Sequence, residues 1–126
     1  MRTLIIKTGG HTDEHEGEVT LEFMQGVVGG TFERYQDPED GRDLHFWVNE
    51  DGIALGLTTN LVASIAAGTQ LRGDVLVTGM NRMGTDIAGL PDEYFREIAY
   101  LKLLIMEGHL PSLDDLPAEM KGGESS

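Results

Sequence analysis

The sequence predicts one α+β domain in which a small β-sheet is covered by helices. Three observations lead to this fold class. Along the chain, short apolar or alternating segments, which are typical of strands, are followed by segments whose apolar residues recur at helical spacing. Glycine pairs and Asp-Gly turns separate these segments. With 126 residues, 40% of them hydrophobic, the chain suffices for one such domain and is too short for two.

The N-terminal part of the chain predicts a strand, a polar loop and a helix. Residues 3–7 contain an apolar triplet before a glycine pair and indicate a buried strand. Residues 11–17 have no apolar period, so we expect a loop there. A helix follows over residues 20–28, because its threonine can cap the first turn, its apolar residues recur at helical spacing, and a glycine pair ends it.

The middle of the chain predicts a hairpin and a second helix. Residues 31–36 and 44–49 alternate between apolar and polar residues, which favours two antiparallel strands joined by a long loop. Thr58 or Thr59 can cap the second helix, and Gly68 supplies its C-terminal stop.

The C-terminal part predicts a central strand, a loop and the longest helix. Residues 71–79 contain a short apolar run that is typical of a buried strand, and residues 80–89 are expected to be a loop. Pro91 opens a helix that continues to about Glu107, with two acidic residues in its first turn. Residues 111–126 turn acidic and then small, so we expect a partly disordered tail.

The resulting order of elements is β-α-β-β-α-β followed by a helix. This order matches the split β-α-β, or ferredoxin-like, two-layer arrangement with an added C-terminal helix. We therefore assign residues 1–110 to a single domain.

The chain is strongly acidic, with a formal net charge of −13. Residues 11–51 hold 12 acidic residues against two arginines, a net charge of −10 for this segment. Such a field repels phosphate backbones, so direct nucleic-acid binding is not expected. It suits a basic partner protein or a mimic of DNA, while a surface charged only for solubility is the plain alternative.

The composition also bears on the compartment. The chain has no cysteine, which excludes disulfides, thiol nucleophiles and thiolate metal sites. Its first residues are far short of a signal-peptide core, and no apolar run approaches the length of a membrane span. A cytoplasmic location without membrane contact is therefore expected.

An aromatic surface is predicted on the hairpin strands. In residues 44–49 the side chains of His45, Trp47 and Asn49 share one side of the strand. Glu33 and Tyr35 are their expected companions on the preceding strand, so an open sheet face would present them together. Such a platform can stack a planar ligand or anchor a protein partner. The alternative is that the third helix covers this face and Trp47 belongs to the core.

Patterns of catalysis and metal binding are weak. His11 and His15 are four residues apart, but the segment between them lacks helical periodicity, so a metal site is not favoured. Residues 79–84 lack the lysine and the hydroxyl residue of a phosphate loop, and Val28-Gly29-Gly30 ends a helix instead of beginning one. No serine or threonine lies in a nucleophile elbow. We expect no enzyme activity, no metal and no cofactor.

The last helix carries more apolar residues than one buried stripe can use. Phe95, Leu103 and Met106 lie partly outside the stripe that faces the domain. Their exposure would create an apolar patch, which a two-fold contact between equivalent helices would remove. The sequence thus predicts a homo-oligomer with these three residues in the interface.

Four segments of the chain form a recognisable pattern, namely Val28-Gly29-Gly30-Thr31-Phe32-Glu33, Val48-Asn49-Glu50-Asp51-Gly52, Gly56-Leu57 with Asn60, and Gly73-Asp74-Val75-Leu76-Val77-Thr78-Gly79. In order and spacing they resemble a family of small domains of unknown function found in bacteriophages, conjugative elements and actinobacteria. The resemblance extends from the first strand to Gly79 and implies an origin in a mobile element, with no catalytic residue assigned. It favours a host-directed or anti-defence role. Asn60, near a helix start, can bond the backbone or a ligand.

Together these observations favour a non-enzymatic, phage-type accessory protein that binds a host protein or a small regulatory ligand. The first alternative is an acidic DNA mimic that inhibits a nuclease or another DNA-binding protein. An uncharacterised enzyme is the third.

Overall fold

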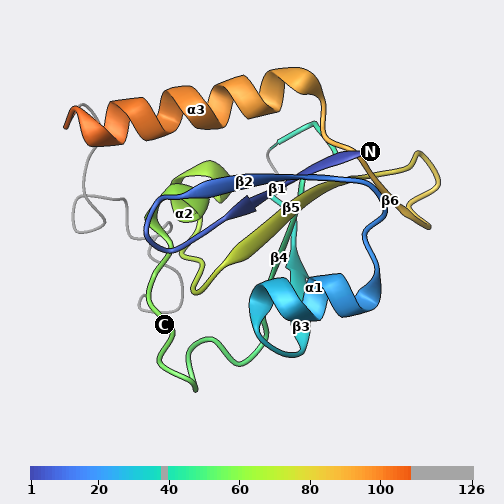
Figure 1. Ribbon diagram of the computed structural model, residues 1–126, viewed down its shortest axis with the longest axis horizontal. Coiled ribbons are helices and arrows are strands. Elements are labelled where there is room, and N and C mark those ends of the chain that lie inside the picture. The colour runs from blue at the N-terminus through green and yellow to red at the C-terminus, as the bar shows by residue number, and fades with distance from the viewer. Residues whose placement is uncertain (38–39, 109–126) are drawn as a thin grey trace.

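The protein has one antiparallel sheet with helices on both of its faces (Figure 1). The computed structural model describes residues 1–37 and 40–108. The elements in chain order are β1 (Arg2–Ile6), β2 (Thr12–Glu16), α1 (Leu21–Val28), β3 (Phe32–Tyr35), β4 (His45–Asn49), α2 (Leu61–Ala67), β5 (Val75–Met80), β6 (Ile87–Ala88) and α3 (Asp92–Met106). The predicted acidic tail, residues 111–126, lies outside the described residues.

The sheet has the strand order β2-β1-β5-β4-β3, and β6 pairs with the end of β5. All of these pairs are antiparallel. The predicted α+β class, with its C-terminal helix, is confirmed. The strand order differs from the split β-α-β arrangement, which would place the first strand between the last and the third of the four predicted strands. Here β5 lies between β1 and β4 instead.

The difference in strand order has a physical reason in β2. This strand occupies the segment that the sequence predicts to be a loop, and it takes one edge of β1. Only one edge of β1 is then left for another strand, and β5 pairs there. A turn that begins at Lys7 joins the two strands, with the Gly10 amide donating to the Lys7 carbonyl and the Lys7 amide donating to the His11 carbonyl.

The β2 strand is stabilised by its backbone ladder and by ion pairs, and the His15 ring stacks on Phe23 of α1 with ring centroids 4.0 Å apart. Its five residues are exposed or half-buried. The Arg2 guanidinium pairs with Glu14, and the N-terminal ammonium lies 3.2 Å from the Glu16 carboxylate. A short, charged edge strand of this kind resists pairing with other chains.

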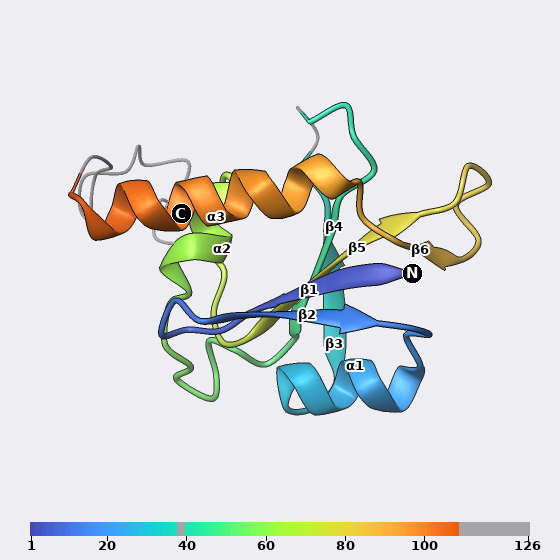
Figure 2. The same cartoon turned by 45° about the horizontal axis from the view of Figure 1, so that its top comes forward.

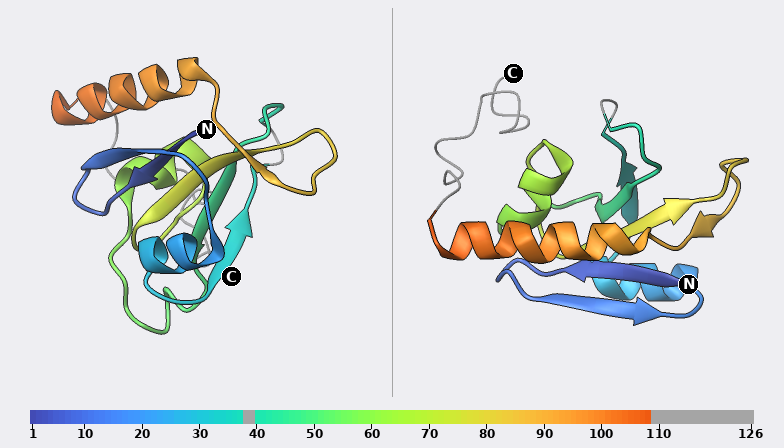
Figure 3. Two further views of the ribbon diagram at one scale, coloured as in Figure 1. Left: turned by 45° about the vertical axis from the view of Figure 1, so that its right-hand side comes forward. Right: turned by 90° about the horizontal axis from the view of Figure 1, so that it is seen from above.

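Helices α2 and α3 pack on one face of the sheet, and α1 packs on the other, as Figure 2 and the right panel of Figure 3 illustrate. The main core lies between the sheet and the helices α2 and α3. Its buried residues from the strands are Leu4, Ile6, Phe46, Val48, Val75 and Val77, and those from the two helices are Val62, Ala63, Ala67, Tyr94 and Ile98. On the opposite face α1 contacts β3, β4 and β5 and buries Met24 and Val28.

The helix ends follow their capping residues. The hydroxyl of Thr20 accepts from the Phe23 amide at the start of α1, as the sequence predicts. Helix α2 begins after Asn60, which caps it in place of Thr58 or Thr59. Helix α3 begins one residue after Pro91. The predicted loop over residues 80–89 contains β6, which pairs with β5 through Gly79 and Met80.

Candidate functional site

The register of the hairpin separates the residues that the sequence predicts to share one surface. Arg34 lies opposite Trp47, and Tyr35 lies opposite Phe46. Because residues that face one another across an antiparallel pair project on the same side, Tyr35 and Glu33 lie on the α2 and α3 face. The other three, His45, Trp47 and Asn49, lie on the α1 face. The long loop between the strands does not fix the register, so sequence parity alone could not find it.

The α1 face is also covered, which corrects the expectation of an open platform. His45 is only 3% exposed, and the Trp47 side chain is half-buried. The Trp47 indole Nε1 donates to the Thr78 hydroxyl at 2.9 Å. Its ring meets Phe32 edge-on, with ring centroids 5.6 Å apart. The predicted alternative is right that a helix covers this face but names the wrong one, because α1 packs there and the third helix, α3, packs on the opposite face.

His45 is a buried imidazole that lies opposite Thr78 of β5 in the sheet. Among the described residues neither of its ring nitrogens has a hydrogen-bond partner. Burial lowers the pKa of His45, the positive charge of Arg34 lowers it further, and Asp43 opposes both effects. The ring is therefore held neutral, as part of the protein interior.

The two asparagines of the predicted site are used by the fold. The Asn49 amide donates to the Val28 carbonyl at 3.1 Å, and its oxygen accepts from the Asp51 amide at 2.8 Å. The side chain thereby ties the end of α1 to the turn after β4.

Asn60 is completely buried and makes three hydrogen bonds. Its Nδ2 donates to the carbonyls of Ile6 and Gly73, at 2.8 and 2.9 Å, and its Oδ1 accepts from the Ala63 amide. Because it reaches no surface, we assign it to the fold and not to a partner contact.

Two of the predicted residues, Glu33 and Asn49, do meet at the rim of a groove. This groove has a volume of about 410 Å³, and we call it the acidic groove. It is bounded by β3, the end of β4, the turn after β4 and the segment before β5, and it is lined by Glu33, Val48, Asn49, Glu50, Asp51, Gly52, Ile53, Ala54, Gln70, Leu71 and Arg72. Sequence reasoning missed it because residues 50–54 and 70–72 meet only in the folded chain.

The acidic groove combines negative charge with an apolar floor. The side chains of Glu33, Glu50 and Asp51 are exposed, while Val48 and Leu71 are buried beneath them. The single cation of the lining, Arg72, is half-buried and donates to the Leu57 carbonyl at 3.2 Å. Such a surface suits a group that carries a positive charge on an aliphatic stem.

The described residues contain no group of three or more histidines and acids placed to hold a metal ion. His11 and His15 lie on or beside the edge strand β2 and make local contacts, with the Asp13 carboxylate at 2.9 Å and with the Glu18 carbonyl at 3.0 Å. In the same described part of the chain, no helix is long and apolar enough to cross a bilayer.

The three residues of the predicted oligomer interface have different environments. Phe95 is half-buried against the core, and the Arg2 guanidinium lies 4.1 Å from the centre of its ring. This contact lies within its own chain, and the place of Phe95 in an interface stays a prediction. Leu103 is 47% exposed and Met106 is 81% exposed, as expected, and Tyr100, which the prediction omitted, is 62% exposed.

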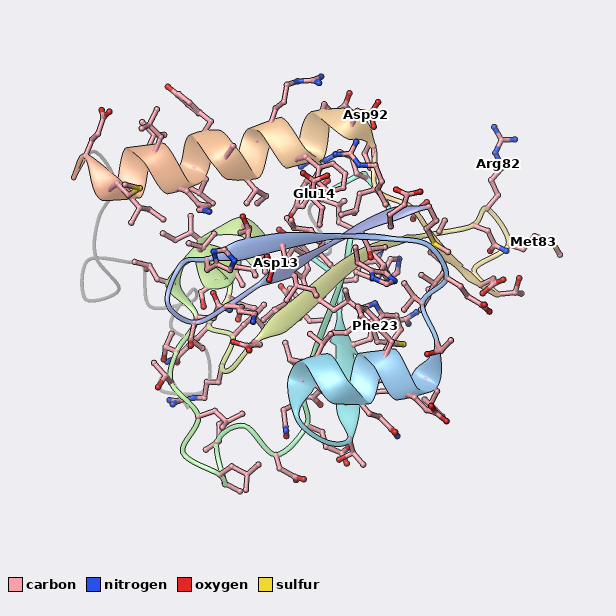
Figure 4. The ribbon with its side chains drawn as sticks, viewed as in Figure 1. Asp13, Glu14, Phe23, Arg82, Met83 and Asp92 are labelled. Atoms are coloured by element: carbon pink, nitrogen blue, oxygen red, sulfur yellow. The ribbon has the colours of Figure 1, made fainter. Side chains whose placement is uncertain are left out.

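The N-terminal end of α3 is fixed by a bridge to the sheet. Arg2 pairs with Glu14 of β2 and, at 3.2 Å, with Asp92 of α3, and Figure 4 shows these two acids close together. A second bridge joins Arg42 of the β3–β4 loop to Glu97 at 2.7 Å and to Asp40 at 3.1 Å. Hydrogen bonds from Arg42 lower the pKa of Asp40.

Comparison with known proteins gives one match. A family model described as a domain of unknown function (DUF3846) matches residues 1–104. The match continues through most of α3, whereas the motifs that the sequence itself offers end at Gly79. No curated protein and no solved structure matches the chain.

Proposed function

The chain belongs to this family of unknown function, and we propose that it is a non-enzymatic binding module whose acidic groove receives a basic segment of a protein partner. The observation that carries the proposal is the composition of the groove. Glu33, Glu50 and Asp51 surround an apolar floor, with Arg72 as the one cation of the lining. A lysine or arginine side chain places its stem on such a floor and its charge among the carboxylates.

The position of the groove supports an extended segment as the ligand. β3 is the last strand of the sheet and, among the described residues, pairs with β4 alone (left panel of Figure 3, in cyan). A partner strand laid along this edge gains backbone hydrogen bonds. Every second side chain of such a strand projects on the face where Glu33 borders the groove.

The finer form of the proposal is a phage-type accessory protein that acts on a host protein. It rests on the four sequence segments that resemble the family of mobile-element domains, and on the acidic net charge of the chain. A small regulatory ligand fits the groove less well. The three exposed carboxylates favour a cation that carries apolar groups next to its charge, as a basic side chain of a protein does.

DNA mimicry is the second candidate, and the distribution of charge weakens it. Most of the described acids of residues 11–51 lie on β2 or around β3, which are the two edges of the sheet. A mimic of a DNA backbone needs its charges along one continuous path to fill a basic cleft. The groove proposal needs only the cluster near β3.

A peptide titration tests the proposal. The probe is a short peptide of alternating lysine and threonine, and its matched partner has glutamate in place of lysine. We expect the lysine peptide to bind by calorimetry, and the double variant Glu33→Gln/Glu50→Gln to weaken binding by about tenfold. The control Glu18→Gln/Glu22→Gln removes the same charge far from the groove.

The control variant should change the affinity by less than about twofold. Equal weakening by both double variants would mean that only the net charge attracts the peptide, and it would overturn the groove as the site. Affinity purification with the wild-type chain and the groove variant, followed by mass spectrometry, then identifies the partner as the protein lost from the variant.

A further inference from the structure

A hairpin projects from the end of the sheet that lies away from the acidic groove. It comprises residues 80–88, with the end of β5, a turn and β6, and Figure 1 shows it in yellow and gold, extending beyond the rest of the sheet. We call it the arm. Its turn is held by the Asn81 side chain, whose oxygen accepts from the Thr85 amide at 2.9 Å, and by the Gly84 amide, which donates to the Asn81 carbonyl. The arm is therefore an ordered part of the fold.

The tip of the arm carries a basic and a large apolar side chain next to each other. Arg82 is exposed, and Met83 is 82% exposed. Both point into solvent and away from the domain (Figure 4). Arg82 forms no ion pair with any described residue, and the acid of the arm, Asp86, accepts from the Ile87 amide instead. A cation beside an apolar side chain is the chemistry that the acidic groove favours.

The carboxylates of the acidic groove also lack a counter-charge. In the part of the chain that the structure describes, Glu33, Glu50 and Asp51 form no ion pair. Arg72, the cation of the lining, is turned to the Leu57 carbonyl. A guanidinium that enters from outside can donate to several of these carboxylates at once.

The arm cannot reach the groove of its own chain. The groove borders the start of β5 through residues 70–72, whereas the arm begins at the other end of this strand. The six residues of β5 separate the two by about 20 Å. We propose that the arm of one copy of this chain enters the acidic groove of a second copy, with Arg82 among the carboxylates and Met83 on the apolar floor.

This inference rests on the proposed function, since it uses the same groove, and it names a second copy as one of the ligands. Because arm and groove lie at opposite ends of β5, the contact is head to tail. Each copy can give its arm to one neighbour and receive the arm of another. A basic partner protein then competes with the arm for the groove.

The contact forms against a general repulsion, because each chain carries a net charge of −13. Physiological salt screens charges beyond about 8 Å, so the groups inside the contact matter most. There one arginine meets three carboxylates, and the stem of Arg82 and the side chain of Met83 bury apolar surface. Since the contact is small, we expect a dissociation constant on the order of tens of micromolar or weaker.

Complementation between two variants tests the contact. The measurement is sedimentation equilibrium of the full chain at physiological salt, from about 10 to about 500 micromolar. We expect the wild type to associate. Arg82→Glu and the groove variant Glu33→Gln/Glu50→Gln should each weaken self-association by about tenfold. An equal mixture should form complexes of two chains, within about threefold of the wild-type affinity for each contact, because the first variant keeps its groove and the second keeps its arm.

The directions of these changes separate the contact from a general effect of charge. The groove variant removes two negative charges and so lowers the repulsion between chains, which by itself would strengthen association. Arg96→Glu, at an exposed position of α3, changes the net charge as Arg82→Glu does and should stay within about twofold of the wild type. Thermal unfolding shows that each variant folds.

The inference and the proposed function can fail separately. A wild type that stays monomeric while the lysine peptide binds would overturn the arm as a ligand and leave the groove as a peptide site. Equal weakening by Arg82→Glu and Arg96→Glu would overturn the contact, as would a mixture that does not associate. Association that the lysine peptide cannot displace would show that the arm binds elsewhere, and it too would overturn the inference.

Discussion

Single polar side chains hold together segments of this chain that are far apart in the sequence. Asn60 joins β1, the segment before β5 and the start of α2 through one amide group. Its two N–H donors bond to carbonyl oxygens that are buried away from water. This explains why Asn60 caps α2 although Thr58 and Thr59 precede it. A threonine hydroxyl could cap the helix, but it could not also donate to two carbonyls.

We predict that Asn60→Asp destabilises the fold strongly. The substitution keeps the acceptor for the Ala63 amide but turns a second oxygen toward the carbonyls of Ile6 and Gly73. The free energy of unfolding should fall by about 3 kcal/mol or more, measured by urea denaturation.

The matched control for this prediction is Asn81→Asp in the exposed turn between β5 and β6. There the Asn81 oxygen accepts from the Thr85 amide, which a carboxylate also does, and the Thr85 hydroxyl, which accepts from the Asn81 amide, can donate to a carboxylate instead. We expect a change below about 1 kcal/mol. Similar losses in both variants would argue against a special role for the buried amide.

His45 gives the stability of the fold a pH dependence. Its pKa in the folded chain lies below the ordinary value of 6.5, because of burial and then of Arg34. As the pH falls below 6.5, the unfolded chain takes up a proton that the folded chain does not. The stabilisation by neutral His45 is therefore complete above this pH and is lost as the pH falls toward the folded pKa. The loss connected with Asp40 begins lower, below 3.8.

The pH dependence can be measured as the difference in unfolding free energy between about pH 7.5 and about pH 5. His45→Gln, which does not titrate, should show a smaller difference than the wild type. A wild-type slope that survives in His45→Gln would show that other groups cause it.

At the scale of elements, two glycines, one in a helix and one in a strand, differ in whether the structure requires a glycine at their position. Gly26 lies inside α1, and a Cβ atom there would meet nothing within 4 Å. Gly79 lies in β5, where a Cβ atom would come within 2.5 Å of the Gly89 carbonyl oxygen. The close approach of the chain after β6 to β5 thus requires a glycine at position 79, whereas α1 does not require one at position 26.

We predict effects of opposite sign for the two alanine variants. Gly26→Ala should raise the free energy of unfolding by about 0.5 to 1 kcal/mol, because alanine is the better helix former. Gly79→Ala should lower it by about 2 kcal/mol or more, because backbone must move. Chemical denaturation of the two variants in parallel decides the matter, and a neutral Gly79→Ala would mean that β6 detaches at little cost.

The elements also differ in how well the sequence predicts them. Helices α1 and α3 are predicted to within about two residues, because caps and apolar spacing are local signals. β2 was missed because its stability comes from its pairing with β1 and from charges on Arg2 and the N-terminus. Neither leaves an apolar alternation in the sequence. β6 was missed because a two-residue strand has no period at all.

For the whole molecule, the α+β class could be predicted, but the strand order and the candidate site could not. The site depends on which strands are neighbours and on the hairpin register, and both are set by contacts between distant residues. The one signal that was available is the run Asn49-Glu50-Asp51-Gly52. Its acids and turn residues, read together with Glu33 on the neighbouring strand, indicate a charged turn beside a sheet edge.

The strand order has a consequence for the synthesis of the chain. β1 is made first, yet it is an internal strand whose second neighbour, β5, begins only at Val75. At translation rates of roughly 5 to 20 residues per second, β1 and β2 wait several seconds for it. During this time the nascent hairpin keeps one apolar strand edge open, while the charges of β2 protect the other. A chain halted before β5 would therefore expose this edge to chaperones, or to other nascent chains on the same message.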